Sequence, residues 1–354
     1  MRAGVVVTAH PGVEELAVQA EELGLHSFWL NDTPMVHGDP FVALGLCAKA
    51  TSRIRLGIGV TSPALRSAPA AASAFASLNA LAPGRIICGI GTGNTARRTL
   101  GMRPTTTAMM ENFTAALQDL CAGGTIEYRE GDRVRNVRFL HTGAHANTAD
   151  PIEFVVAALG PKAAAVAGRR GTGLISFGLP DPTAWQALHD TRRHAAHDTP
   201  HGPDSRVDSY LVTALHILEE DEDPSGDTVR DATGHIVLSL LAFAADTAAD
   251  ARAFAEQLGP EEREAVWRLL DRRGTTATAP DRHTKLYPNY LGRIAPEDRD
   301  LILPSLMNTL ALVGTRDDLR ARIATLEQAG VDELLIQPVI DPPIEIAQLA
   351  KLLT

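Results

Sequence analysis

Residues 51–94 constrain the fold of this chain more than any other stretch. Two apolar runs, at residues 54–60 and 85–90, flank the alanine-rich segment 68–81, which is followed by a Pro-Gly pair. This order predicts a strand, a helix and a second strand. Two buried strands joined by a crossover helix must lie parallel to each other. The stretch therefore predicts a β/α unit.

The same alternation of strand and helix begins at the first residues and continues along most of the chain. Helices are predicted at residues 13–23, 41–50, 68–81, 109–120, 162–170, 181–196, 315–330 and 344–353. Strands are predicted at residues 3–9, 26–30, 54–60, 85–90, 152–158, 173–177, 210–218 and 333–337. Eight strands with intervening helices predict an α/β fold, a (β/α)₈ TIM barrel, as a single domain over residues 1–354.

Two segments interrupt the alternation. Residues 123–149 contain two short strand-like runs around Glu130-Gly131-Asp132, which predicts a hairpin insert. Residues 219–303 are rich in charge and in helix-forming residues, which predicts a helical insertion after the seventh strand, near the active face. A solvated decoration without a role at the site is an equally good interpretation of the second segment.

Composition excludes several classes of function. The net charge of −10 argues against nucleic-acid and anionic-membrane partners, because both need a basic surface. No apolar run approaches the ~20 residues of a membrane span, and the N-terminus does not resemble a signal peptide. We therefore expect a cytoplasmic protein. The wide spacing of Cys47, Cys88 and Cys121 predicts neither disulfides nor a zinc site, and His141 and His145 lie in a loop, so no metal site is expected.

A glycine-rich loop follows the predicted fourth strand and contains Gly89, Gly91 and Gly93. Loops at the carboxyl ends of parallel strands carry the chemistry of such folds, and glycine lets a ligand approach the backbone closely. The run does not match the dinucleotide fingerprint, which follows a first strand with a different glycine spacing. From these residues alone, tight turns at strand ends are the simpler explanation.

Few titratable residues are predicted at the strand ends. Asp32 follows the second strand and is the best candidate for acid–base catalysis, with a loop cap as the competing interpretation. His10 follows the first strand, and His37, in the same loop as Asp32, is a weaker candidate. A cluster in the helical insertion is predicted to be either a substrate lid or surface decoration: His283, Lys285, Tyr287 and Tyr290.

Five segments carry a family resemblance, and they occur in a fixed order. They are AEELG with FWLND (20–32), TSRIRLG with VTSP and Arg66 (51–66), LAPGR with GIGTGN and LG (81–101), AALGPK with AG (157–168), and VGT with AGVDE (313–333). Together they resemble the bacterial-luciferase-like superfamily, specifically its F420-dependent branch, whose members are similar to methylenetetrahydromethanopterin reductase.

The resemblance implies a TIM barrel that binds coenzyme F420, or less often FMN, at the strand carboxyl ends. It implies a cis peptide at Gly59–Val60, in a bulge behind the deazaflavin ring that continues into Thr61 and Ser62. It also implies further cofactor contacts. Thr92, Gly93 and Asn94 would line the ring edge or tail, backbone N–H groups of Ala158, Leu159 and Gly160 would bind the phosphate at a helix start, and Ser176, Phe177 and Gly178 would complete that cradle.

Two departures from the family pattern narrow the expected chemistry. Some sugar-phosphate-oxidising members carry a glutamate at the position of Asn94 and a histidine at that of Thr33, so their reaction is not expected here. The Ala-Asp-Gly that precedes the sixth strand in the family is Gly171-Thr172-Gly173 in this chain, which affects the phosphate loop rather than the fold.

The sequence and the resemblance together predict an oxidoreductase that transfers a hydride between F420 and a small-molecule substrate. Reduction of a C=N or C=C bond, or the reverse dehydrogenation, suits a site with few acids, with Asp32 or His10 handling the proton. The alternatives are a monooxygenase that uses reduced FMN and oxygen, and a non-catalytic flavin-binding homologue. The family also implies a homodimer.

Overall fold

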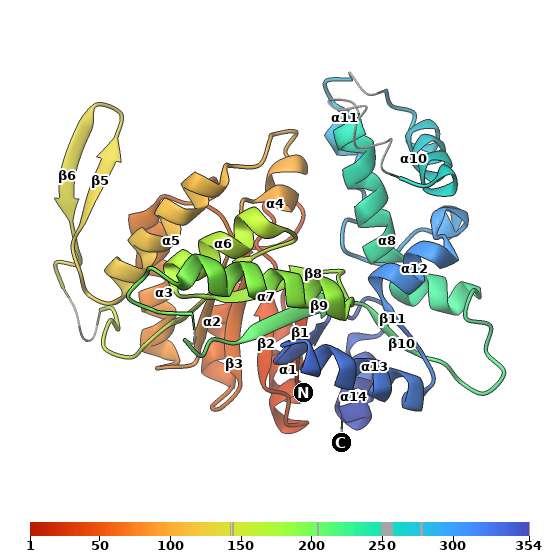
Figure 1. The fold of residues 1–354 in the computed structure, drawn as a ribbon, viewed down its shortest axis with the longest axis horizontal. Coiled ribbons are helices and arrows are strands. Elements are labelled where there is room, and N and C mark those ends of the chain that lie inside the picture. The colour runs from red at the N-terminus through yellow and green to blue at the C-terminus, as the bar shows by residue number, and fades with distance from the viewer. Residues whose placement is uncertain (142, 144, 204, 249–257, 277–278, 354) are drawn as a thin grey trace.

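Eight parallel strands close into a barrel, which confirms the predicted fold class (Figure 1). The computed structural model describes residues 1–354 except 142, 144, 204, 249–257, 277–278 and 354. The strands follow the order β1-β12-β9-β8-β7-β4-β3-β2 around the barrel. Their bounds are β1 (Arg2–Val7), β2 (Ser27–Leu30), β3 (Arg55–Thr61), β4 (Ile86–Ile90), β7 (Glu153–Ala157), β8 (Gly173–Phe177), β9 (Ser209–Thr213) and β12 (Glu333–Ile336).

Helices surround the barrel at nearly the predicted positions. Asp39 caps α2 through its side chain, which accepts hydrogen bonds from the backbone N–H groups of Phe41 and Val42. Thr315 and Asp318 form a capping box at the start of α13. The helices that follow the barrel strands are α1 (Val13–Glu22), α2 (Pro40–Ala50), α3 (Ala68–Leu81), α4 (Asn94–Arg98), α5 (Thr107–Cys121), α6 (Pro161–Arg170), α7 (Pro182–Ala196), α13 (Arg316–Gln328) and α14 (Pro342–Leu353).

Large side chains fill the barrel interior. Trp29 on β2 is fully buried there and meets the Tyr210 ring edge to face, with 5.1 Å between the ring centroids. A Cβ atom on Gly57 would collide with the Trp29 indole, so β3 needs a glycine at this point. The interior cluster consists of Val6, Trp29, Ile87, Val155, Ile175, Tyr210, Val212 and Leu335.

The predicted seventh strand, residues 210–218, is in fact two strands with different partners. β9 (Ser209–Thr213) belongs to the barrel, whereas β10 (Leu215–Ile217) pairs in parallel with β11 (Leu312–Gly314) outside it. The partner changes at Ala214, whose carbonyl accepts a hydrogen bond from the N–H of Leu312 at 2.9 Å. Because β10 precedes the helical insertion and β11 follows it, the two strands join the start of the insertion to its end.

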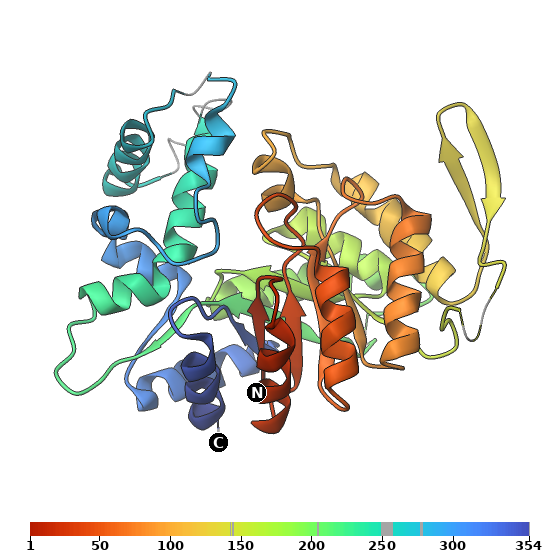
Figure 2. The same ribbon diagram turned by 180° about the vertical axis from the view of Figure 1, so that it is seen from behind.

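Helices make up the described part of the insertion, as predicted, although they extend to Leu310 rather than to residue 303. They pack around an apolar core of their own that includes Leu241, Leu269 and Leu301. In Figures 1 and 2 they rise on the same side of the barrel as α4. The elements are α8 (Asp227–Ala248), α10 (Pro260–Arg272), α11 (Arg282–Leu286), the 3₁₀ helix η1 (Pro296–Leu301) and α12 (Pro304–Leu310).

Polar contacts fix the insertion to the strand carboxyl ends. Asp246 on α8 lies between two arginines, 2.7 Å from Arg98 of α4 and 2.6 Å from Arg282 of α11. At the end of β12, Gln337 Nε2 donates to the carbonyl of Leu291 at 3.2 Å. The insertion therefore contacts the loops that follow β4 and β12. Residues 249–257 and 277–278 of this segment lie outside the described residues.

The predicted hairpin insert is present as β5 (Ile126–Glu130) and β6 (Arg133–Val137), which pair antiparallel. It projects away from the barrel on the side opposite the insertion (Figures 1 and 2). Residues 142 and 144 of the predicted segment 123–149 lie outside the described residues. Within the part of the chain that the structure describes, no helix is both long and apolar enough to cross a membrane.

A carboxylate at the amino-terminal end of the barrel joins two of the five family segments. Glu21 of α1 accepts hydrogen bonds from the backbone N–H groups of Ser52 at 3.0 Å, Arg53 at 2.6 Å and Ile54 at 2.8 Å. Burial alone would raise the pKa of Glu21, but these donors lower it from 4.5 to about 2. The ionised carboxylate thus holds the turn that leads into β3.

We predict that Glu21→Gln lowers the free energy of unfolding at pH 7 by about 1–3 kcal/mol, because hydrogen bonds to a charged acceptor are lost. The pKa of Glu21 is lower in the folded state, so its contribution is complete above the unfolded value of 4.5 and disappears as the pH falls toward about 2. Denaturant unfolding between pH 7 and pH 3 measures this difference. Glu22→Gln, an exposed neighbour, is the control, and an equal loss in both variants would contradict the prediction.

Candidate active site

Three half-buried apolar side chains form a platform at the carboxyl end of the barrel interior. Val60, Ala157 and Phe177 come from the ends of β3, β7 and β8 and pack on the interior cluster below them. Loops after the strands surround this platform. Its apolar surface suits one face of a planar aromatic ring.

The end of β3 has the conformation that the family resemblance implied. The peptide bond between Gly59 and Val60 is cis, and the register against β4 shifts between Ile58 and Thr61. Thr61 and the following Ser62 are fully buried. β3 therefore bulges at the point where Val60 joins the platform.

Two glycines of the glycine-rich loop make room for Val60. A Cβ atom on Gly89 would lie 2.8 Å from Val60 Cγ1, and one on Gly91 would lie 2.8 Å from Val60 Cγ2. Such distances are too short for carbon atoms in contact. These glycines are therefore required by the packing of Val60, at the end of β3, against the end of β4 and the loop after it.

Beyond the loop, the chain forms the short helix α4, which the sequence analysis treated as loop. Gly93 precedes it with a positive φ of 73°, and a Cβ atom there would lie 2.6 Å from Ser62 Oγ. Asn94 Oδ1 accepts a hydrogen bond from Arg98 Nε at 2.8 Å, which directs the amide NH₂ of Asn94 to the other side. The carbonyl of Thr92 accepts from the backbone N–H of Thr105 at 2.9 Å.

The expected phosphate cradle is only partly available. The N–H of Ala158 donates to the carbonyl of Ile175 at 2.9 Å, and the N–H of Gly178 donates to that of Val212 at 2.8 Å. Both N–H groups extend the hydrogen bonding of the barrel, so the N–H of Ala158, one of the expected phosphate donors, is already used.

The start of α6 and a nearby hydroxyl remain free for an anion. No side chain caps α6, and an added Cβ atom on Gly160 would meet nothing within 4 Å. Leu159 and Lys162 beside it are exposed. Ser176 Oγ is buried without a hydrogen-bond partner among the described residues. A negatively charged group at this position would accept hydrogen bonds from the uncapped start of α6. If it also reached Ser176, it would give that hydroxyl a partner. The residues present therefore fit a phosphate.

Asp32 anchors a loop. It follows β2, has 3 % of its surface exposed, and its Oδ2 lies 2.6 Å from Nη1 of Arg66. Arg66 Nη2 also lies 2.6 Å from Asp39 Oδ2, so one guanidinium joins the loops after β2 and β3 to the start of α2. Burial raises the pKa of Asp32, and although the charge of Arg66 lowers it, the pKa stays above its ordinary value.

Of the two histidine candidates, the structure favours the one that the sequence ranked lower. His10 is exposed, and its Nδ1 lies 2.9 Å from the carbonyl of Pro11. His37 is half-buried, and its Nε2 has no hydrogen-bond partner among the described residues. Burial lowers the pKa of His37 below its ordinary 6.5, which favours the neutral imidazole.

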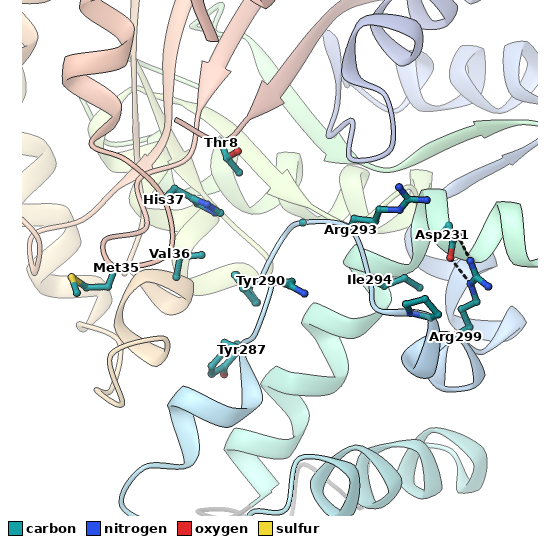
Figure 3. A pocket seen from close by; sticks show the side chains of 13 residues that line it. Thr8, Met35, Val36, His37, Asp231, Tyr287, Tyr290, Arg293, Ile294 and Arg299 are labelled. Carbon is teal, nitrogen blue, oxygen red and sulfur yellow. Dashed lines mark hydrogen bonds and ion pairs between the residues drawn. The ribbon is translucent and has the colours of Figure 1, made fainter. Parts of the chain in front are cut away.

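A cavity of ≈ 830 Å³ lies between the loops after β1 and β2 and the insertion (Figure 3). Met35, Val36 and His37 line it from one side, and Tyr287 and Tyr290 from the other. The two tyrosines confirm that part of the predicted lid cluster reaches the cavity, whereas His283 packs against Gly101 and Lys285 pairs with Asp281. Sequence analysis missed the remaining lining residues, Thr8, Asp231, Asn289, Gly292, Arg293, Ile294, Pro296 and Arg299.

No metal site is present among the described residues, since none of their histidines, cysteines, aspartates and glutamates form a group able to hold an ion. His141 and His145 are exposed, with ring centroids 5.7 Å apart.

Two relatives of known function illustrate the sequence similarity. A 5,10-methylenetetrahydromethanopterin reductase from Methanolobus tindarius is 25% identical over 93% of this chain and 91% of its own length. An F420-dependent glucose-6-phosphate dehydrogenase from Kineococcus radiotolerans is 38% identical over 180 residues, which are 47% of this chain and only 52% of that enzyme.

Similarity to solved structures concerns the fold. The F420-dependent tetrahydromethanopterin reductase from Methanopyrus kandleri superimposes with a TM-score of 0.67 at 18% identity, over 99% of this chain and 97% of that structure. The sequence profile of the luciferase-like monooxygenase family matches residues 7–333. The chain therefore belongs to the luciferase-like monooxygenase family, the superfamily that its five segments resemble.

Proposed function

We propose that this protein is an F420-dependent oxidoreductase that transfers a hydride between the deazaflavin and a small organic substrate. The observation that carries the proposal is the form of the barrel mouth, where an apolar platform adjoins the uncapped start of α6. A planar ring joined to a phosphate matches this combination. The relatives named F420-dependent, and the reductase that matches almost the whole chain, support F420 as the cofactor.

In this proposal the cofactor ring lies on Val60 and Phe177, with Thr92 and Asn94 near its edge or tail. The free NH₂ group of Asn94 is able to donate a hydrogen bond, since Arg98 holds the amide oxygen. When bound, a deazaflavin supplies the hydride transfer itself. The platform shields one face of the ring from water, so that the substrate approaches from the other face.

The phosphate of the cofactor would lie at the start of α6. The N–H groups of Leu159 and Gly160, the hydroxyl of Ser176 and the ammonium of Lys162 are the donors available for it. Together they form a backbone site with one positive side chain, which is a common arrangement for anions at helix starts.

We propose His37 as the group that holds or accepts the proton. It lines the cavity, and burial lowers its pKa, which favours the neutral imidazole. Asp32 is a positioning residue in this proposal, since its carboxylate contacts Arg66 and it does not line the cavity. His10 is exposed beside Pro11 and is the weaker candidate.

The main alternative is a monooxygenase that uses reduced FMN and oxygen, as the name of the family indicates. A non-catalytic flavin-binding homologue is the third possibility, and any turnover would exclude it. We also propose that the protein is a homodimer and that it is cytoplasmic. Sedimentation of the purified protein tests the first, and imaging of the tagged protein in its host tests the second.

We predict that Gly160→Val lowers the affinity for F420 at least 10-fold, which is about 1.4 kcal/mol of binding free energy. The melting temperature should stay within about 2 °C of the wild-type value. Gly160 has an extended backbone, which accepts valine, and the side chain would occupy the open space where the phosphate is placed. Fluorescence titration with F420 and with FMN measures the effect, and wild-type protein should prefer F420.

Gly45→Ala is the matched control, because Gly45 lies on α2, away from the cradle. Equal F420 affinity in wild type and Gly160→Val would show that the phosphate lies elsewhere. Tighter FMN binding, with oxygen consumed when reduced FMN is supplied, would favour the monooxygenase.

We predict that His37→Gln lowers turnover by about 10²–10⁴-fold, as expected for a positioned acid–base group. In the wild type, the rate should change with pH around a pKa below 6.5, because burial lowers the pKa of His37. His37→Gln should remove this pH dependence. Asp32→Asn should lower turnover and the melting temperature while the pH profile keeps its shape. The assay is steady-state turnover with F420 and a substrate found by screening. The prediction is contradicted if His37→Gln keeps the wild-type pH profile while Asp32→Asn loses it. Asp32 would then be the acid–base group.

A further inference from the structure

One segment of the insertion, residues 289–294, forms a wall of the cavity and is fixed at several points. The Leu291 carbonyl accepts from Gln337 at the end of β12, and Tyr290 Oη lies 3.2 Å from Thr95 Oγ1 of α4. Ile294 is 5 % exposed and lies in the apolar core of the insertion. Arg293 therefore extends from a backbone that both the barrel and the insertion hold in place.

The backbone of this segment is also strained. Asn289 and Leu291 have φ values of 52° and 58°, and Met35 on the opposite wall has a φ of 66°. Residues other than glycine rarely adopt positive φ, and each instance is energetically unfavourable. Such strain persists where the surrounding contacts impose it, and it concentrates at functional sites.

Arg293 is the charge in the cavity lining that has no counterion. Arg299 forms two short contacts with Asp231, Nε to Oδ1 at 2.7 Å and Nη2 to Oδ2 at 2.6 Å, and a third with Asp227 at 3.2 Å. Arg293 is exposed, and no acidic residue among those the structure describes pairs with it. Two arginines and one aspartate give the lining one excess positive charge, in a chain whose net charge is −10.

From this arrangement we propose that the substrate is an organic anion whose carboxylate or phosphate binds Arg293. A guanidinium binds either group through two parallel hydrogen bonds. The apolar body of the substrate would lie between Val36 and the two tyrosines, Tyr287 and Tyr290, in a cavity whose ≈ 830 Å³ is within the usual range for small ligands. This inference rests on the proposed function, and it gives the insertion the role of selecting the substrate.

F420 carries negative charges too, so the cofactor is the competing ligand for Arg293. The two sites are built from different elements. The phosphate cradle belongs to α6 and β8, whereas Arg293 belongs to the segment between α11 and η1. Substitution of Arg293 should therefore leave the affinity for F420 within 2-fold, about 0.4 kcal/mol by RT ln 2.

The test uses benzoate, phenyl phosphate and benzamide as probes for the full-length protein loaded with F420, with binding measured by calorimetry or NMR. Wild-type protein should bind one or both anions at least 10-fold more tightly than the neutral amide. Arg293→Gln should remove this preference by weakening the anions alone. Arg293→Lys should keep part of the preference for anions, because the lysine ammonium keeps the positive charge but lacks the paired N–H donors of the guanidinium. Arg129→Gln, on the exposed hairpin, is the control.

The proposal is overturned if wild-type protein does not prefer either anion, or if Arg293→Gln keeps the preference. A loss of F420 affinity in Arg293→Gln would also overturn it, because the arginine would then serve the cofactor. Failure of F420 to bind the wild type would count against the proposed function instead. The anion preference of the cofactor-free protein, measured with the same probes, would still decide the role of Arg293.

Discussion

The packing of Val60 against two glycines, one at the end of β4 and one in the loop after it, determines the form of the barrel mouth. Gly89 and Gly91 leave the space that the branched side chain occupies, and β3 bulges at that point. Val60 then joins Ala157 and Phe177 as the apolar platform. A larger residue at either glycine would push β3 away from β4 and remove the surface on which we place the cofactor.

The same loop connects the platform to the insertion. After Gly93 the chain enters α4, whose Arg98 holds both the amide of Asn94 and the carboxylate of Asp246. Asp246 also contacts Arg282, and β10 and β11 join the two ends of the insertion. The proposed cofactor site and the cavity wall are thus connected through a few polar contacts.

Sequence alone was sufficient for the barrel but not for the details of the mouth. Alanine-rich composition before a Pro-Gly pair located α3 at its observed bounds, Ala68–Leu81, and the helix predicted at residues 315–330 is close to α13, Arg316–Gln328. By contrast, α4 has five residues, too few to show a helical period. The apolar run through Ala214 hid the change of strand partner because β9 and β10 are both buried.

The site residues depend on contacts between distant parts of the chain. Asp32 binds Arg66, 34 residues away, which no local pattern indicates. The N–H of Ala158 is used by Ile175 of the neighbouring strand, so the expected donor was not free. Which residue of the loop after β2 faces the cavity depends on the insertion, whose docking is invisible in the sequence. For this reason His37 ranked below His10 until the structure placed it in the cavity lining.

The most direct test of the central claim is the identity of the cofactor that stays bound when the protein is isolated from a host that makes both F420 and FMN. Mass spectrometry and the visible absorbance spectrum of the released molecule identify it. The account predicts F420, bound in equal molar amount to the protein. FMN in its place, with oxygen consumed by the reduced complex, would contradict the account.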